Sequence, residues 1–152
     1  MNAPGRFLVL DLGTKRVGVA VCDELHLTTR PLAQLARGSW KNLLLSVKGL
    51  VEEFAPLGLV IGLPLNLDGT EGTAAWDARR VARNFALSLK IPVYLQDERL
   101  TSRAAEEFLG IHARPNAAQR AQIDSQAAAI ILSDFLAQPH PEQRRITTQD
   151  AP

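Results

Sequence analysis

The sequence predicts an α/β protein built on one mixed five-stranded sheet, with helices packed on both faces. Two apolar runs typical of β-strands, 7–12 and 17–22, are separated by four turn residues that include Gly13, and this arrangement predicts a hairpin. Farther along the chain, segments with helical spacing alternate with short apolar runs, an order typical of helices that pack on a sheet. With 152 residues, the chain has the length of a single ordinary domain.

The remaining predicted elements follow from periodicity and from helix signals. The expected strands cover residues 26–35, 57–61 and 91–95. The expected helices cover residues 40–54, 74–89, 101–109 and 116–137. Pro31 places the first of these strands at a sheet edge, because proline cannot donate a ladder hydrogen bond. Ser39 is a predicted N-cap, and Asn116 with Gln119 resembles a capping box.

The end of the chain lacks such signals. Residues 139–152 are polar, contain three prolines and show no periodicity, so we expect a disordered tail after a domain that covers residues 1–138.

Composition narrows the class of protein. The chain is 46% hydrophobic and 22% charged, and no apolar run approaches the roughly 20 residues of a membrane span. The N-terminus enters the first strand without the features of a signal peptide, so we expect a cytoplasmic protein without a membrane partner. The net charge is only +1, so nucleic acid would have to bind a local basic patch. Cys22, the single cysteine, is interpreted as a small buried hydrophobe.

Asp11 does not fit the strand that contains it. Its neighbours are apolar on both sides, so the carboxylate must lose solvation and requires a partner. Asp11 could cap the turn or pair with Lys15 or Arg16, and a metal ion is the alternative partner. The choice depends on whether other carboxylates come near.

Asp124 is a second misfit, because it lies in the apolar stripe of the last predicted helix. Taking about 100° per residue, that stripe contains Ala127, Ala128, Ile131, Leu132 and Phe135. A carboxylate there is costly unless it faces a cation, which is either a metal ion or a nearby arginine such as Arg120. Asp134, at the edge of the stripe, is interpreted as a surface residue.

Asp97 and Glu98 follow the last predicted strand. Ligand sites in α/β proteins are commonly found where parallel strands end. Alternation sends the two side chains to opposite faces, so one turns toward Asp11 and Asp124 while the other pairs with Arg99 or caps the next helix. Spacing alone does not select between them.

Three convergent carboxylates predict metal-dependent chemistry. Oxygen ligands without a histidine or cysteine cluster favour Mg or Mn. Two such ions can activate a water molecule and stabilise the leaving oxygen of a phosphodiester, without a covalent protein nucleophile. Side chains that flank the proposed cluster could bind the phosphate backbone. They are Lys15, Arg16, Asn66, Arg99 and Arg120. No aromatic platform for bases is evident in these loops, so we expect contacts with backbone more than with bases.

Four segments resemble the YqgF, or RuvX, family. They are LDLGTKRVGVA (10–20), IGLPLNLDGT (61–70), DERLTS (97–102) and IDSQAAAIIL (123–132). The resemblance implies a ribonuclease H-like fold, shared with Holliday junction resolvases, and a nuclease that matures the 5′ end of pre-16S ribosomal RNA. It also implies that Asp11, Glu98 and Asp124 are the catalytic, metal-binding set, which selects Glu98 over Asp97.

The chain departs from the family before the last motif. Members often have a lysine-rich stretch there, whereas this chain has ARPNAAQRAQ at 113–122, so we expect weaker contact with nucleic acid. Two alternatives remain. One is a Holliday junction resolvase or other DNA nuclease, and symmetric junction cutting would require a homodimer rather than a monomer. The other is a non-catalytic nucleic-acid-binding module, although such a module gains nothing from unpaired buried carboxylates.

The turn after Asp11 also resembles the first phosphate loop of the actin, Hsp70 and sugar-kinase group. Enzymes of that group need two such domains around a cleft, and 152 residues supply only one. We therefore do not expect an ATPase or kinase.

Overall fold

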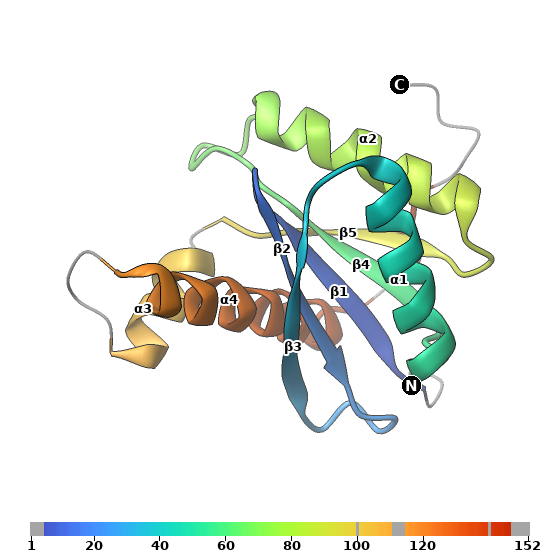
Figure 1. The fold of residues 1–152 in the computed structure, drawn as a ribbon, viewed down its shortest axis with the longest axis horizontal. Helices are drawn as coiled ribbons and strands as arrows, with labels where there is room; N and C mark the ends of the chain where they lie inside the picture. Colours follow the sequence, from blue (N-terminus) through green and yellow to red (C-terminus); the bar gives the residue numbers. More distant parts are fainter. Residues whose placement is uncertain (1–4, 100, 111–114, 140, 147–152) are drawn as a thin grey trace.

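A five-stranded sheet forms the centre of the computed structural model, with helices on both sides of it (Figure 1). The structure describes residues 5–99, 101–110, 115–139 and 141–146. The strands are β1 (Phe7–Leu12), β2 (Arg16–Cys22), β3 (Thr29–Ala36), β4 (Gly58–Leu63) and β5 (Val93–Asp97). The helices are α1 (Trp40–Phe54), α2 (Thr73–Ser88), α3 (Thr101–Leu109), α4 (Ala117–Ala137) and the short 3-10 helix η1 (Pro141–Arg144). Within the described residues, none of these helices is long and apolar enough to span a membrane.

The strand order is β3-β2-β1-β4-β5, which confirms the predicted mixed sheet with a hairpin and an edge strand. β1, β2 and β3 are antiparallel neighbours, whereas β4 and β5 run parallel to β1. The carboxyl ends of β1, β4 and β5 therefore lie at one edge of the sheet. β4 and β5 reach two residues farther toward this edge than predicted, because Leu63 pairs with Asp97 in the parallel ladder.

Strand alternation divides the apolar residues between two packed layers. Leu8 and Leu10 of β1 face α1 and α2, in a layer that also contains the fully buried Phe85. Phe7 and Val9 point the other way and pack against α4. Figure 1 shows α1 and α2 on one side of the sheet and α4 on the other. Helices thus cover both faces, as predicted.

Local signals set the helix ends as the sequence predicts. The Asn42 N–H donates to Ser39 Oγ at 3.2 Å at the start of α1. Asn116 and Gln119 form a reciprocal capping box at the start of α4. Gly110 follows α3 with φ of 70°, a left-handed conformation that glycine adopts without a steric penalty.

Residues 141–146 lie within the predicted tail (139–152), and in the structure they make contacts with the domain. η1 forms immediately after α4, and the Ile146 N–H donates to the Val93 carbonyl at 2.7 Å. This segment therefore lies against β5, the strand at one edge of the sheet.

Arg144 holds the segment in place through contacts that periodicity does not reveal. Its Nη1 donates to the Oε1 of buried Gln96 at 2.5 Å, and its guanidinium lies 4.4 Å from the centre of the Phe135 ring. These are contacts between distant parts of the chain, so composition and local pattern gave no sign of order here.

Candidate acidic site at the sheet edge

Three carboxylates are placed at the same edge by three separate elements. Asp11 belongs to β1, and alternation puts it on the face of Phe7 and Val9, which is the α4 face. Glu98 comes directly after β5, and its N–H donates to the carbonyl at the end of β4 at 3.1 Å. Asp124 lies near the beginning of α4. All three predicted acidic residues therefore point toward the space between the sheet and α4.

Asp11 and Glu98 form a hydrogen-bonded carboxyl pair. Burial and, next in size, the negative charge of Asp11 raise the pKa of Glu98 to about 10. Burial also raises the pKa of Asp11, the hydrogen bond from Glu98 lowers it, and the charge of Asp124 raises it. Two carboxylates this close cannot both ionise cheaply, so Glu98 holds the proton and donates to Asp11. The pair requires either a proton or a cation.

Two glycines, on the two strands that flank β1, allow the backbone of Asp124 and the carboxyl group of Glu98 to approach the sheet closely. Gly18 of β2 pairs with Asp11, and a Cβ atom on it would lie 2.5 Å from the backbone oxygen of Asp124. A Cβ atom on Gly62 of β4 would lie 2.9 Å from the carboxyl carbon of Glu98. Any larger residue would therefore push α4 or the Glu98 side chain away from the sheet. Both glycines lie in the segments that resemble family motifs.

Asp124 is held from the opposite side of the site. Gln34 of β3 donates from Nε2 to Asp124 Oδ2 at 3.1 Å. The alternative of an ion pair with Arg120 is not found among the described residues. No pattern in the sequence pointed to Gln34, because its partner is 90 positions away.

The three carboxylates are the type of ligand expected for a hard divalent cation. In the structure, however, they do not all lie close enough together to bind one ion. Within the described ranges, no group of three or more His, Cys, Asp or Glu side chains is placed to hold a metal ion. Asp11 and Glu98 are in direct contact, whereas the Asp124 carboxylate bonds to Gln34. The structure thus forms a pair with a third carboxylate beside it.

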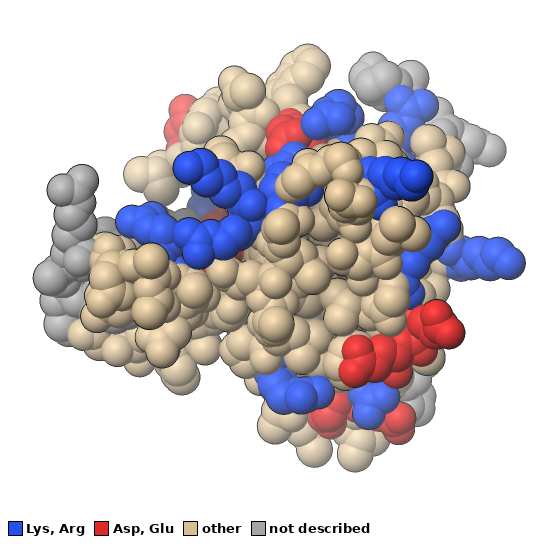
Figure 2. All heavy atoms as spheres, in the orientation of Figure 1, with Lys and Arg blue, Asp and Glu red and all other residues tan. Residues whose placement is uncertain are grey.

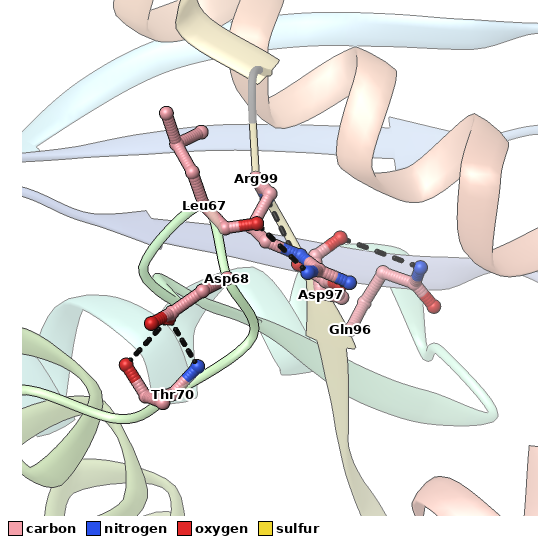
Figure 3. A network of polar contacts seen from close by, with 6 residues as sticks. All are labelled: Leu67, Asp68, Thr70, Gln96, Asp97 and Arg99. Atoms are coloured by element: carbon pink, nitrogen blue, oxygen red, sulfur yellow. Dashed lines mark hydrogen bonds and ion pairs between the residues drawn. The ribbon is translucent and has the colours of Figure 1, made fainter.

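Asp97 points away from the acidic pair, as one of the two predicted alternatives requires. It shares a face with Val93 and Leu95, which belong to the layer under α1 and α2. Arg99 donates from its backbone N–H and from Nε to the Asp97 carboxylate, each at 2.9 Å. Figure 3 shows Asp97 and Arg99 directed toward each other beside Leu67 of the 64–72 loop, whose carbonyl lies 3.4 Å from Arg99 Nη1.

The predicted phosphate-binding residues differ in their exposure and in whether their side chains already have partners. Lys15 in the β1–β2 turn and Arg16 at the start of β2 are exposed, and Arg120 is exposed at the start of α4. Arg99 is paired with Asp97, and Asn66 donates to Thr70 Oγ1 at 2.9 Å within its own loop. Figure 2 shows Lys and Arg side chains around a hollow between the start of α4 and the loop before α2.

Arg37 is a further residue that sequence reasoning missed. It follows β3 and donates from Nη1 to the Gly13 carbonyl at 2.8 Å and from Nη2 to Asp77 Oδ2 at 2.7 Å. Its backbone N–H donates to the Lys15 carbonyl at 2.9 Å. Arg37 therefore ties the β1–β2 turn, which carries Lys15 and Arg16, to the start of α2.

The same fold occurs in nucleases of known structure. T. thermophilus RuvC, solved in complex with a Holliday junction substrate, has a TM-score of 0.56 at 13% identity, over 93% of this chain and 99% of that one. The human cytomegalovirus terminase nuclease domain has a TM-score of 0.52 at 13% identity, over 96% of this chain and 89% of that one. The fold, with its acidic edge, is that of a ribonuclease H-like protein.

Sequence relatives narrow this class to one family. The family model described as "RuvX: Holliday junction resolvase" matches residues 5–138. Two relatives carry the name "Putative pre-16S rRNA nuclease". The protein from Syntrophus aciditrophicus is 44% identical over 86% of this chain and 87% of its own length, and the protein from Synechococcus elongatus is 35% identical over 93% and 95%. This chain belongs to the RuvX family, as its four motifs predict, and is a phosphodiester hydrolase.

Proposed function

We propose that this protein is a divalent-metal-dependent nuclease that cleaves precursor ribosomal RNA at the 5′ side of the 16S sequence. The observation that carries the proposal is the half-buried, hydrogen-bonded Asp11–Glu98 pair, with Asp124 close enough to Asp11 to raise its pKa. A protein that needed these residues only for folding would be more stable with neutral side chains at the same positions.

The carboxylates fit a hard divalent cation. The proton that joins Asp11 to Glu98 occupies the place where positive charge is required, and a cation would satisfy both oxygens once that proton left. Asp11 and Glu98 would hold the metal, and Asp124, whose carboxylate Gln34 orients, would complete the set. All-oxygen ligands favour Mg or Mn. When bound, such ions supply an activated water and stabilise charge on the leaving oxygen.

The chain's own cations would position the substrate. Lys15, Arg16 and Arg120 are exposed beside the acidic edge and are available to phosphate oxygens. Arg99 is committed to Asp97 and Leu67, so its role is to fix the 64–72 loop next to Glu98 rather than to reach for the backbone. With Lys15, Arg16 and Arg120 free for phosphates and Arg99 holding the loop, a nucleic-acid strand would lie across the carboxyl ends of β1 and β5.

The substrate follows from the relatives and from the chemistry. Carboxylate-bound metal does not distinguish RNA from DNA at the reacting phosphate, so selectivity must come from the surrounding surface. The curated relatives are named as nucleases of pre-16S rRNA, which favours RNA and a role in the cytoplasm. We expect ribosomal context to set the position of the cut.

The test compares three substrates in Mn with the wild-type protein and Asp124→Asn. They are single-stranded RNA that spans the 5′ precursor junction, the matched DNA, and a four-way DNA junction. We expect the wild type to cut the RNA and Asp124→Asn to leave it intact. If neither protein cuts any substrate, the proposal fails and a binding module is favoured.

A Holliday junction resolvase is the second candidate, because the matching family model carries that description. Symmetric resolution needs two active sites related by a two-fold axis. Asp124-dependent cleavage of the junction alone, by a protein that light scattering shows to be a dimer, would establish this function in place of RNA processing.

A further inference from the structure

Trp76 is an exposed aromatic side chain in an unusual place. It lies in the first turn of α2 with 72% of its surface accessible. The other tryptophan, Trp40, is partly buried and packs on Phe85 with the ring centres 4.7 Å apart. A large aromatic side chain normally buries its surface, so a tryptophan held in solvent on a rigid helix suggests a ligand that covers it.

The topology brings Trp76 to the edge that carries the carboxylates. α2 follows β4, so its first turn lies at the carboxyl end of the parallel strands (Figure 1). Arg37 connects the two places, because it donates both to the Gly13 carbonyl, two residues after Asp11, and to the carboxylate of Asp77, the residue next to Trp76. The helix turn that carries Trp76 is therefore tied to the turn that follows Asp11 through the partly buried guanidinium of Arg37.

The surroundings of Trp76 suit an anionic chain better than an apolar partner. Arg80 lies one helical turn after Trp76, on the same side of α2, and is largely exposed. Lys15 and Arg16 are exposed on the turn that Arg37 ties to α2. The Asp77 carboxylate is already neutralised by Arg37 and Arg80, each within 2.8 Å. An exposed ring with exposed cations on its own helix and on the turn tied to that helix suits a single strand, with phosphates on the cations and a base on the ring.

We propose that Trp76 is a stacking platform for an unpaired base of the substrate strand, beside the bond that is cut. This inference rests on the proposed nuclease function and adds single-stranded nucleic acid as the form recognised. It differs from the expectation that no aromatic platform for bases is evident. The sequence reading overlooked Trp76 because it lies off the apolar stripe of α2 and carries no motif of its own.

The test is a binding measurement on the full chain in chelator, so that no cleavage occurs. A short single-stranded RNA is titrated into the wild type while tryptophan fluorescence is followed. We expect quenching in the wild type and in Trp40→Phe, and none in Trp76→Leu. Anisotropy of a labelled strand should show about tenfold weaker binding for Trp76→Leu, near-normal binding for Trp76→Phe, and unchanged binding for Leu87→Ala at the other end of α2.

An RNA with abasic positions separates stacking from backbone contact. The abasic strand should bind the wild type about as weakly as the intact strand binds Trp76→Leu. Equal affinity of wild type and Trp76→Leu for the intact strand would overturn the proposal. So would a change of oligomeric state in Trp76→Leu without loss of RNA binding, which would assign the ring to a contact between copies. Tryptophan-dependent binding without cleavage in Mn would refute the nuclease function but would still support the stacking of an unpaired base on Trp76.

Discussion

The two faces of the sheet are covered in different ways, and the acidic site occupies the face with less cover. Under α1 and α2 the buried cluster is entirely apolar and includes large side chains such as Phe85 and Ile61. On the other face a single long helix, α4, approaches the sheet through small residues such as Ala128. The apolar layer on the α4 face stops before the carboxyl end of β1, where Asp11 replaces the next apolar residue.

This difference shows where a fold can carry buried charge. A carboxylate in the middle of the layer under α1 and α2, among residues such as Phe85, would be enclosed by apolar atoms and could reach neither solvent nor a cation. At the start of α4, Gly18 and Gly62 leave space for carboxyl groups, and Asp11 and Glu98 remain half-buried. The face under α1 and α2 therefore stabilises the fold, and the end of the α4 face holds the proposed catalytic carboxylates.

Separate substitution of Asp97 and Glu98, the two neighbouring carboxylates at the end of β5, gives the strongest test of the difference between the two faces of the sheet. We expect Glu98→Gln to lower cleavage by at least about a thousandfold, or roughly 4 kcal/mol in the activation barrier, because it removes a charged oxygen ligand. Asp97→Asn, on the opposite face, should cost less than about tenfold. Single-turnover cleavage in Mn measures both. Equal losses in the two variants would contradict the division between the faces.

On the apolar face the expected effect is on stability alone. Phe85→Ala should lower the free energy of unfolding by about 3–5 kcal/mol, because the fully buried ring leaves a cavity. Phe108→Ala, which truncates a ring that is 72% exposed, should change it by less than about 0.5 kcal/mol. Urea denaturation followed by circular dichroism provides the measurement. A specific catalytic loss in folded Phe85→Ala would show that the two faces are coupled.

The metal-free protein should lose stability as pH rises. The pKa of Glu98 is raised to about 10 from an ordinary value of 4.5, so the folded state keeps a proton that the unfolded chain releases. The resulting stabilisation is fully present below about pH 4.5 and disappears as the pH approaches 10. Thermal denaturation in chelator at several pH values measures it. Glu98→Gln should remove most of this slope, and an unchanged slope would place the titrating group elsewhere.

The smallest expected effect concerns the contact that crosses from β3 to α4. Gln34→Ala should reduce cleavage by about tenfold at limiting Mn, because the Asp124 carboxylate loses its hydrogen bond. At saturating Mn the rate should approach that of the wild type. Gln122→Ala, at an exposed position of α4, is the matched control. If Gln34→Ala has the same Mn dependence as the wild type, Gln34 does not position Asp124.

The sequence by itself determined the class of fold and predicted which acidic residues form the proposed site. Periodicity and caps act over a few positions, so the hairpin, the edge strand and the limits of α4 could be predicted from local pattern. Asp11 and Asp124 were evident because each interrupts an apolar stripe. Family resemblance added Glu98, which no spacing argument could separate from Asp97.

Only the tertiary structure decided how these residues meet. The face on which Glu98 lies depends on where β5 ends, and that end is set by pairing with β4. The contact of Gln34 with Asp124 joins residues 90 positions apart, and that of Arg37 with Asp77 joins residues 40 apart. Such contacts depend on strand register and on how a helix packs on a sheet, which are properties of the whole fold and leave no periodic trace in the chain.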